Sequence, residues 1–113
     1  MHEIRIAEDL FTIVREVAEK EKLSKVTKVS ITFGRMIQIV PEIFEFAFRE
    51  TVRDSVAKDA ELDIELAEIR LKCRNCSNEF LPEDNLFSCR LCNSVETDII
   101  HGKELFIKSI EGE

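Results

Sequence analysis

The residues with the clearest chemistry in this sequence are four cysteines arranged as two C-x2-C pairs. Cys73 and Cys76 form the first pair, Cys89 and Cys92 form the second, and twelve residues separate the pairs. Two residues between cysteines allow a tight turn to direct both sulfurs at one ion, and two such turns complete a tetrahedron. The pattern therefore predicts a four-thiolate metal site, for which zinc is the usual ion.

Three other interpretations of these cysteines are open at this stage: two disulfides, a redox-active pair and a rubredoxin-like iron site. A redox-active pair normally follows a strand-to-helix setting that lowers the pKa of one thiol, and no such setting precedes Cys73 or Cys89. Spacing alone does not separate iron from zinc, but visible absorption does. A closed four-thiolate site has no open coordination position, so we interpret it as structural rather than catalytic.

The segment that carries the cysteines is too poor in apolar residues to fold on its own. Its large apolar side chains within residues 73–92 are Phe80, Leu81, Leu86, Phe87 and Leu91. Ordering a residue costs roughly 1–2 kcal/mol for the backbone alone, whereas structural zinc contributes on the order of 10–16 kcal/mol in finger peptides. We therefore expect this segment to fold only when metal is bound.

A second candidate metal site lies at the start of the sequence, Met1-His2-Glu3. The α-amine of Met1, the backbone amide of His2 and its imidazole can close fused chelate rings around one ion, with the amide of Glu3 as a further donor. Such nitrogen donors favour planar Ni(II) or Cu(II) over tetrahedral zinc. Because imidazole and α-amine groups titrate near 6.5 and about 7.7–8.0, protons compete with the ion below about pH 7. Taken alone, an incidental histidine is the simpler explanation, and the site requires an unblocked Met1.

Composition limits the class of protein. The chain has 113 residues, of which 44% are apolar and 35% charged, and a net charge of −7. These values indicate one folded domain, or one domain with a small appendage. No apolar run is long enough to cross a bilayer, and we expect no secretory signal, so the thiols point to a reducing compartment. The acidic charge disfavours binding to phosphate backbones.

Apolar periodicity predicts the elements that position both sites. In chain order we expect a helix at 3–22, a strand at 29–33, a short strand or loop at 36–40, a helix from 41 to about 58, a strand from 62 that changes phase at 67, and strands at 95–100 and 104–110. This order predicts an α+β fold with two helices packed on a small β-sheet. A four-cysteine zinc-ribbon-like module is inserted before the last strand.

The second helix carries most of the predicted aromatic core. The cluster at residues 44–48 is expected to pack in the core, with a groove for a partner as the alternative. Phe46 and the acidic residues of both helices are candidates for partner contact, and His101, beside Gly102, is a candidate supplementary metal ligand or a simple turn residue. The apolar side of the second helix is predicted to comprise Ile43, Phe44, Ala47, Phe48 and Val52.

Several separated motifs together resemble the HypA family, the nickel metallochaperones of nickel–iron hydrogenase maturation, over essentially the full length. The motifs are Met1-His2-Glu3 opening a helix, Gly34-Arg35 after a strand, Pro41-Glu42 starting a Phe-rich helix, the two cysteine pairs, and a closing segment from Gly102 to Glu111. The sequence departs from the family at two positions, since Ser77 and Asn93 follow the cysteine pairs where the family usually has glycine.

The resemblance implies a protein with two metals and no enzymatic activity. Nickel would be held transiently by His2 and Glu3, in a nickel-binding α+β domain of residues 1–68 and 98–113. Zinc would be held permanently by the four cysteines, in a module of residues 69–97. The implied partners are a HypB-type GTPase, a hydrogenase large-subunit precursor and urease accessory proteins. The protein would be a cytoplasmic monomer or homodimer that binds neither nucleic acid nor membrane.

The main alternative is a zinc-ribbon module that binds nucleic acid or a transcription complex. Arg70, Lys72, Arg74 and Arg90 lie in or beside the cysteine segment and could form a local basic patch. The acidic charge of the whole chain argues against this function.

Overall fold

The computed structural model describes residues 2–82 and 86–113, and of His2 it describes only the backbone. Helix α1 spans His2–Lys20 and helix α2 spans Pro41–Val52. A 3₁₀ turn, Arg35–Ile37, stands where the sequence indicated a short strand or a loop. The strands are β1 (Val26–Gly34), β2 (Glu61–Ala67), β3 (Arg70–Cys73), β4 (Glu79–Phe80), β5 (Thr97–His101) and β6 (Leu105–Gly112). Neither described helix has the length and apolar character that a bilayer crossing needs.

Contacts between residues divide the chain into two units. The first comprises the described residues up to Thr32 together with Ile39–Glu65 and Phe106–Glu113, and the second comprises Phe33–Gln38 and Leu66–Leu105. The strands form two three-stranded sheets, with the orders β2-β1-β6 and β4-β3-β5. Because β6 follows the cysteine segment but pairs with β1, that segment is inserted before the last strand. The predicted α+β fold is confirmed.

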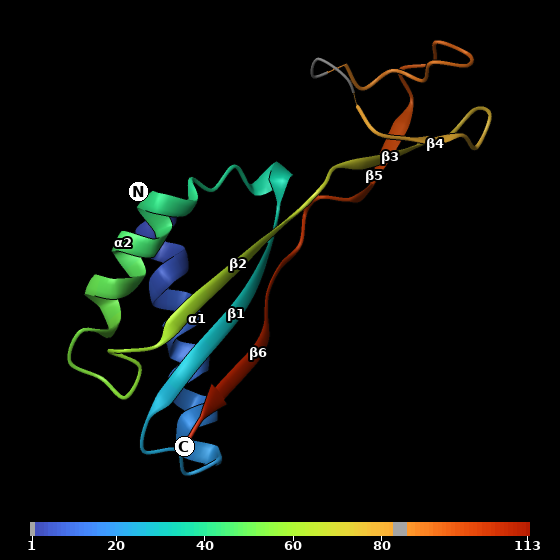
Figure 1. The fold of residues 1–113 in the computed structure, drawn as a ribbon. Helices are drawn as coiled ribbons and strands as arrows, with labels where there is room; N and C mark the ends of the chain where they lie inside the picture. Colours follow the sequence, from blue (N-terminus) through green and yellow to red (C-terminus); the bar gives the residue numbers. More distant parts are fainter. Residues whose placement is uncertain (1, 83–85) are drawn as a thin grey trace. The chain divides into compact units, whose positions relative to one another are not determined.

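In the first unit, α1 and α2 lie on one face of the β2-β1-β6 sheet, and their N-terminal ends lie at the same end of the unit (Figure 1). β1 is the central strand, and all its residues except Thr27 and Lys28 are buried. α1 contributes small and branched apolar residues at three- and four-residue spacing, as an amphipathic helix does. The buried residues of α1 are Ala7, Leu10, Val14 and Ala18.

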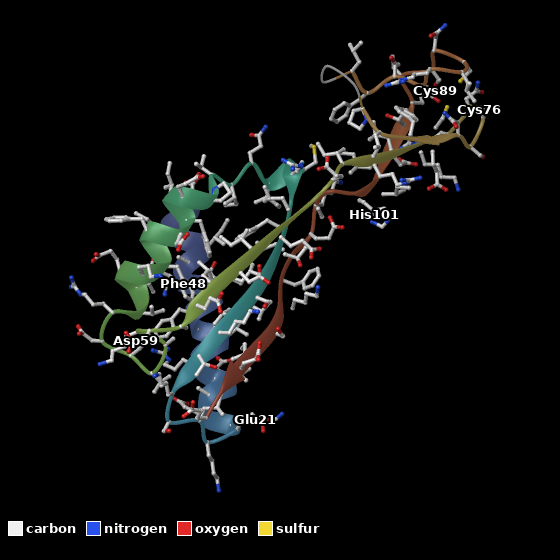
Figure 2. All side chains as sticks on the ribbon, viewed as in Figure 1. Glu21, Phe48, Asp59, Cys76, Cys89 and His101 are labelled. Carbon is white, nitrogen blue, oxygen red and sulfur yellow. The ribbon has the colours of Figure 1, made fainter. Side chains whose placement is uncertain are left out.

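The phenylalanines of α2 divide between core and surface. Phe44 and Phe48 are fully buried and stack with their ring centroids 5.9 Å apart, whereas Phe46 is 70% exposed. Figure 2 marks Phe48 on this helix. The prediction that Ile43 belongs to the buried side is wrong, because Ile43 is 43% exposed. The buried stripe begins one position later, at Phe44, and continues through Ala47, Phe48 and Val52.

α2 ends at Val52 rather than near Lys58, as the sequence had predicted. The hydroxyl of Ser55 donates to the carbonyl of Val52 at 2.7 Å and accepts from the N–H of Ala57 at 3.1 Å. A serine side chain that bonds to the local backbone competes with helical hydrogen bonding. The chain therefore leaves the helix in a series of turns.

α1 ends in a Schellman motif. The N–H of Leu23 donates to the carbonyl of Ala18 at 2.8 Å, and the N–H of Lys22 donates to that of Glu19 at 3.3 Å. Lys22 adopts the left-handed conformation, with φ of 56°. This arrangement satisfies the last carbonyls of the helix and directs Leu23 back toward Ala18.

The second unit has little apolar core. β3 pairs antiparallel with β4 and with β5, so that Leu71 lies opposite both Phe80 and Ile99. Phe33 and Leu71 are fully buried, but Leu91 and Val95 are 75% and 82% exposed. Apolar burial alone is therefore a weak source of stability for this unit.

The last residue of β1 approaches the backbone of residues 102–104 very closely. Gly34 donates its N–H to the carbonyl of Glu104 at 2.6 Å, and Met36 donates its own to that of Gly102 at 2.8 Å. A Cβ on Gly34 would lie 2.0 Å from the carbonyl oxygen of Gly102. Only glycine fits at this position without moving the backbone.

Candidate metal centre

The four cysteine sulfurs form a single cluster in the second unit. All four atoms lie within 4.8 Å of one another, and the pairs Cys73–Cys92 and Cys76–Cys89 each have sulfurs 3.5 Å apart. Cys76 and Cys89 are marked in Figure 2. Tetrahedral coordination at about 2.3 Å per bond places thiolate sulfurs about 3.8 Å apart. Because all four cysteines are free thiols, the cluster fits one tetrahedral metal ion.

Each C-x2-C pair lies in the same type of hydrogen-bonded turn. In the first turn, the N–H of Cys73 donates to the carbonyl of Asn78 at 2.9 Å, and the N–H of Ser77 donates to the carbonyl of Cys73 at 3.0 Å. The corresponding bonds of the second turn are 2.9 and 2.8 Å long. The repeated geometry explains how two short motifs direct two sulfurs each toward one point.

Ser77 and Asn93 occupy the positions where the sequence departs from the usual glycine. Both adopt the left-handed conformation, with φ of 63° and 60°. Asparagine visits this region more readily than serine. The turns are therefore retained without glycine, with more backbone strain at Ser77 than at Asn93.

Two asparagines donate hydrogen bonds to the sulfurs, and sequence analysis did not identify them. The backbone N–H of Asn75 lies 3.4 Å from the sulfur of Cys73, and the side-chain amide of Asn78 lies 3.9 Å from that of Cys89. Outer donors of this kind orient and stabilise thiolate ligands. Their only signal in the sequence is the position of each asparagine within or beside a C-x2-C turn.

The thiols differ in acidity because their hydrogen-bond donors differ. The backbone N–H of Cys92 lowers the pKa of Cys89 to about 6, and the side chain of Asn75 lowers the pKa of Cys92. The backbone N–H of Asn78 also lowers the pKa of Cys76. The contact of the Cys76 thiol with Cys89 and the loss of hydration of that thiol together have the larger effect and raise its pKa to about 12. Four adjacent thiolates repel one another, so full ionisation of the cluster calls for a bound cation.

Two arginines near the four-cysteine cluster, Arg74 and Arg70, form ion pairs with carboxylates. Arg74 donates from Nε and Nη2 to one carboxylate oxygen of Asp98, at 2.9 and 2.7 Å. This bond lowers the pKa of Asp98 and raises that of Arg74. Arg70 lies 3.4 Å from a carboxylate oxygen of Glu79. Sequence analysis did not identify these pairs, which join residues far apart in the sequence.

The predicted nickel residues lie at the start of α1. Met1 and the side chain of His2 are outside the described residues. Glu3 lies in the first turn of α1, and its carboxylate accepts a hydrogen bond of 3.5 Å from the N–H of Val40, the residue that precedes α2. The bond places the N-terminal ends of two helices together, where the macrodipoles are positive and the first N–H groups lack intrahelical partners.

His101 lies at the end of β5 and is not among the residues of the four-sulfur cluster. Its Nδ1 is 3.6 Å from a carboxylate oxygen of Glu104, and its side chain is 61% exposed. The other carboxylate oxygen of Glu104 accepts the N–H of Gly102 at 2.6 Å. The pKa of Glu104 is lowered by hydrogen bonds from two backbone N–H groups, first that of Glu104 itself and then that of Gly102.

Comparison with known proteins identifies the family. A family model described as "Hydrogenase/urease nickel incorporation, metallochaperone, hypA" matches residues 1–112. The chain belongs to the HypA family. Two curated HypA proteins, each named hydrogenase maturation factor HypA, align with almost the whole chain. That of Wolinella succinogenes is 36% identical over 114 residues, covering 100% of this chain and 96% of the relative. That of Aquifex aeolicus is 34% identical over 111 residues, covering 98% and 96%.

A solved HypA structure shares the fold. The solution structure of the Ni metallochaperone HypA from Helicobacter pylori superposes with a TM-score of 0.70 at 29% identity, covering 97% of this chain and 96% of that one. As a HypA protein, the chain is a metallochaperone of hydrogenase maturation and not an enzyme. The family and the class of function predicted from the sequence are confirmed.

Proposed function

We propose that this protein binds Ni(II) at its N-terminus, holds a structural zinc ion in the four-cysteine cluster, and delivers nickel with a HypB-type GTPase to a nickel–iron hydrogenase large-subunit precursor. The full-length family match carries the proposal. A four-thiolate metal site requires reduced cysteines, which a reducing compartment maintains, so we place the protein in the cytoplasm.

Zinc is the ion that best suits Cys73, Cys76, Cys89 and Cys92. The spacing of their sulfurs fits tetrahedral thiolate coordination. Four thiolate ligands fill a tetrahedral site and leave no coordination position for a substrate, which supports a structural role in the module predicted at residues 69–97. Zinc supplies binding energy to a unit in which apolar burial is slight.

The nickel site is proposed to comprise the α-amine of Met1, the amide and imidazole of His2, and the backbone amide of Glu3. The Glu3 carboxylate is engaged by Val40, which supports donation from the backbone rather than from the side chain. Amide N–H groups at a helix start have no partner four residues earlier, so their use as ligands breaks no helical bond. Nitrogen donors that compete with protons for the ion suit reversible binding.

The proposal is tested by nickel titration of the zinc-loaded chain with a native N-terminus, using isothermal calorimetry. We expect His2→Ala to weaken nickel binding by more than about 100-fold, since even outer-shell changes cost about 10–100-fold. Extending the chain by one residue before Met1 should have a similar effect, because the α-amine is displaced. Zinc content and fold should be unchanged in both variants.

His101→Ala is the matched control, because His2 and His101 are the two histidines of the chain. This variant should bind nickel as the unmodified chain does. Unchanged nickel affinity in His2→Ala would contradict the N-terminal assignment, and loss of affinity in His101→Ala alone would move the site to the second unit.

The structure gives no support to the alternative of a nucleic-acid-binding ribbon. Two of the arginines that suggested a basic patch, Arg70 and Arg74, are paired with Glu79 and Asp98. Phosphate binding would have to displace these carboxylates in a chain of net charge −7.

A further inference from the structure

A groove of about 470 Å³ lies in the first unit where α1 and α2 end. We call it the C-terminal groove. Apolar and charged side chains from both helices and from the turns that follow them line the groove, and we call the apolar set its floor and the charged set its rim. The floor residues are Phe11, Ala18, Leu23 and Val56.

The local endings of the two helices create this groove. The Schellman motif of α1 turns Leu23 back beside Ala18. The serine-bonded turn after α2 places Asp54 and Val56 across from α1. Both features depend on short-range hydrogen bonds, so the groove is a built part of the fold.

Among the charged residues of the rim, some form an ion pair and others do not. Arg53 lies 3.3 Å from the carboxylate of Glu50, and the guanidinium of Arg15 lies 5.6 Å from the ring centre of Phe11. The rim also carries two further carboxylates, Glu19 and Asp54.

Glu19 and Asp54 give the groove its charge preference. Neither has an ion-pair partner among residues 2–82 and 86–113. The C-terminal ends of the two helices add partial negative charge at the same place. Three carboxylates and two guanidinium groups line the groove, so its side chains carry a net charge of −1. The groove therefore combines an apolar floor with a weakly negative rim.

We propose that the C-terminal groove docks a basic, amphipathic segment of a partner protein. An aliphatic side chain of that segment would lie on the apolar floor, and a lysine or arginine beside it would pair with Glu19 and Asp54. The volume is within the range of about 300–1,000 Å³ that is usual for binding pockets. The proposal rests on the proposed function, because a metallochaperone acts through protein partners.

The position of the groove separates docking from metal transfer. Glu3 and Glu19 are sixteen residues apart on α1, which is about 24 Å at 1.5 Å per residue. A docked segment that covers only the C-terminal groove therefore leaves the N-terminal nickel ligands uncovered. The first unit would hold its partner at one end of the helix pair and release the ion at the other.

The test uses the full, zinc-loaded chain and NMR chemical-shift mapping. The probe is a short helical peptide with leucine and arginine on one face, and the comparison probe carries glutamate in place of arginine. We expect the basic peptide to shift the amide signals of Ala18, Leu23 and Val56, and the acidic peptide to leave them unchanged.

The double variant Glu19→Gln/Asp54→Asn should weaken binding of the basic peptide about threefold to tenfold, as expected for two exposed charge pairs. The matched control is Glu61→Gln/Asp63→Asn, which removes the same charge from exposed positions of β2 in the same unit. The control should bind the peptide like the unmodified chain.

Three results would overturn the proposal: no shift at the floor residues with the basic peptide, equal binding of the acidic peptide, or equal weakening by both double variants. The last would indicate general attraction to an acidic surface. Nickel titration of Glu19→Gln/Asp54→Asn separates this proposal from the proposed function. Its nickel affinity should be unchanged, whereas failure of the nickel site would appear in the His2→Ala experiment alone.

Discussion

Removing metal from the four-cysteine cluster should unfold the second unit and leave the first unit folded. Phe33 and Leu71 are the large apolar residues other than the cysteines, among the described residues of the second unit, that are less than 2% exposed, and burial of two such side chains contributes about 3–6 kcal/mol. Structural zinc contributes about 10–16 kcal/mol in small domains, which is comparable to the whole stability of a typical domain, about 5–15 kcal/mol. The core of the first unit does not include the cluster.

The assay must work without tryptophan or tyrosine, since the chain has neither. Amide NMR spectra before and after chelation report on each unit separately. We expect the signals of Leu71 and Thr97 to collapse to unfolded positions while those of Val29 and Phe48 stay dispersed. Trypsin should then cleave at Arg74 and other basic residues of the cysteine segment much faster than before.

Two controls make the prediction specific. Restoring zinc should restore the dispersed signals, and Cys92→Ser should reproduce the unfolding without a chelator. Dispersed signals for Leu71 and Thr97 in a sample shown to be metal-free would refute the reasoning, because apolar packing and the β3 pairings would then suffice.

Three further predictions follow from particular side chains. Phe48→Ala should lower the free energy of unfolding of the first unit by about 3–5 kcal/mol, whereas Phe46→Ala, at a position that is 70% exposed, should change it by less than about 0.5 kcal/mol; equal effects in urea titration would contradict the burial. Ser77→Gly should stabilise the zinc-loaded second unit by about 0.5–1 kcal/mol, and Asn93→Gly by less, because asparagine tolerates the left-handed conformation better; chelator-competition midpoints give this order. The folded pKa of Glu104 lies below its ordinary value, so its contribution to stability is present above about pH 4.3 and is lost as the pH falls through the folded pKa. Glu104→Gln should flatten the acid side of the stability profile, and an unchanged profile would contradict the assignment.

Local patterns predicted the parts of the molecule that depend on local rules. The C-x2-C spacing predicted the convergence of the sulfurs because a tight turn needs nothing beyond its own residues. The buried stripe of α1 followed from a sustained apolar period. Ile43 was misassigned because periodicity averages over a helix and does not locate the edge of the stripe. The end of α2 depended on one hydroxyl, Ser55, whose hydrogen bonds leave no periodic signal.

The remaining features depend on contacts that no spacing rule connects. Arg74 and Asp98 are brought together by the pairing of β3 with β5, so neither residue alone indicates the other. The same holds for Glu3 and Val40, which meet only because the two helices start at the same end of the unit. The C-terminal groove likewise arises from two helix endings that are distant in the sequence.

The contact between Gly34 and Gly102 restricts how this family can diverge. Neither position offers room for a methyl group: a Cβ on Gly34 would meet the carbonyl of Gly102, and one on Gly102 would lie 2.9 Å from the Cα of Ile69. A substitution at one of these glycines cannot be compensated by a smaller side chain nearby, because the atoms closest to the added Cβ are backbone atoms. A homologue with a larger residue at either position must therefore have a different backbone path in this region. Such a replacement would identify relatives in which the two backbone segments meet differently.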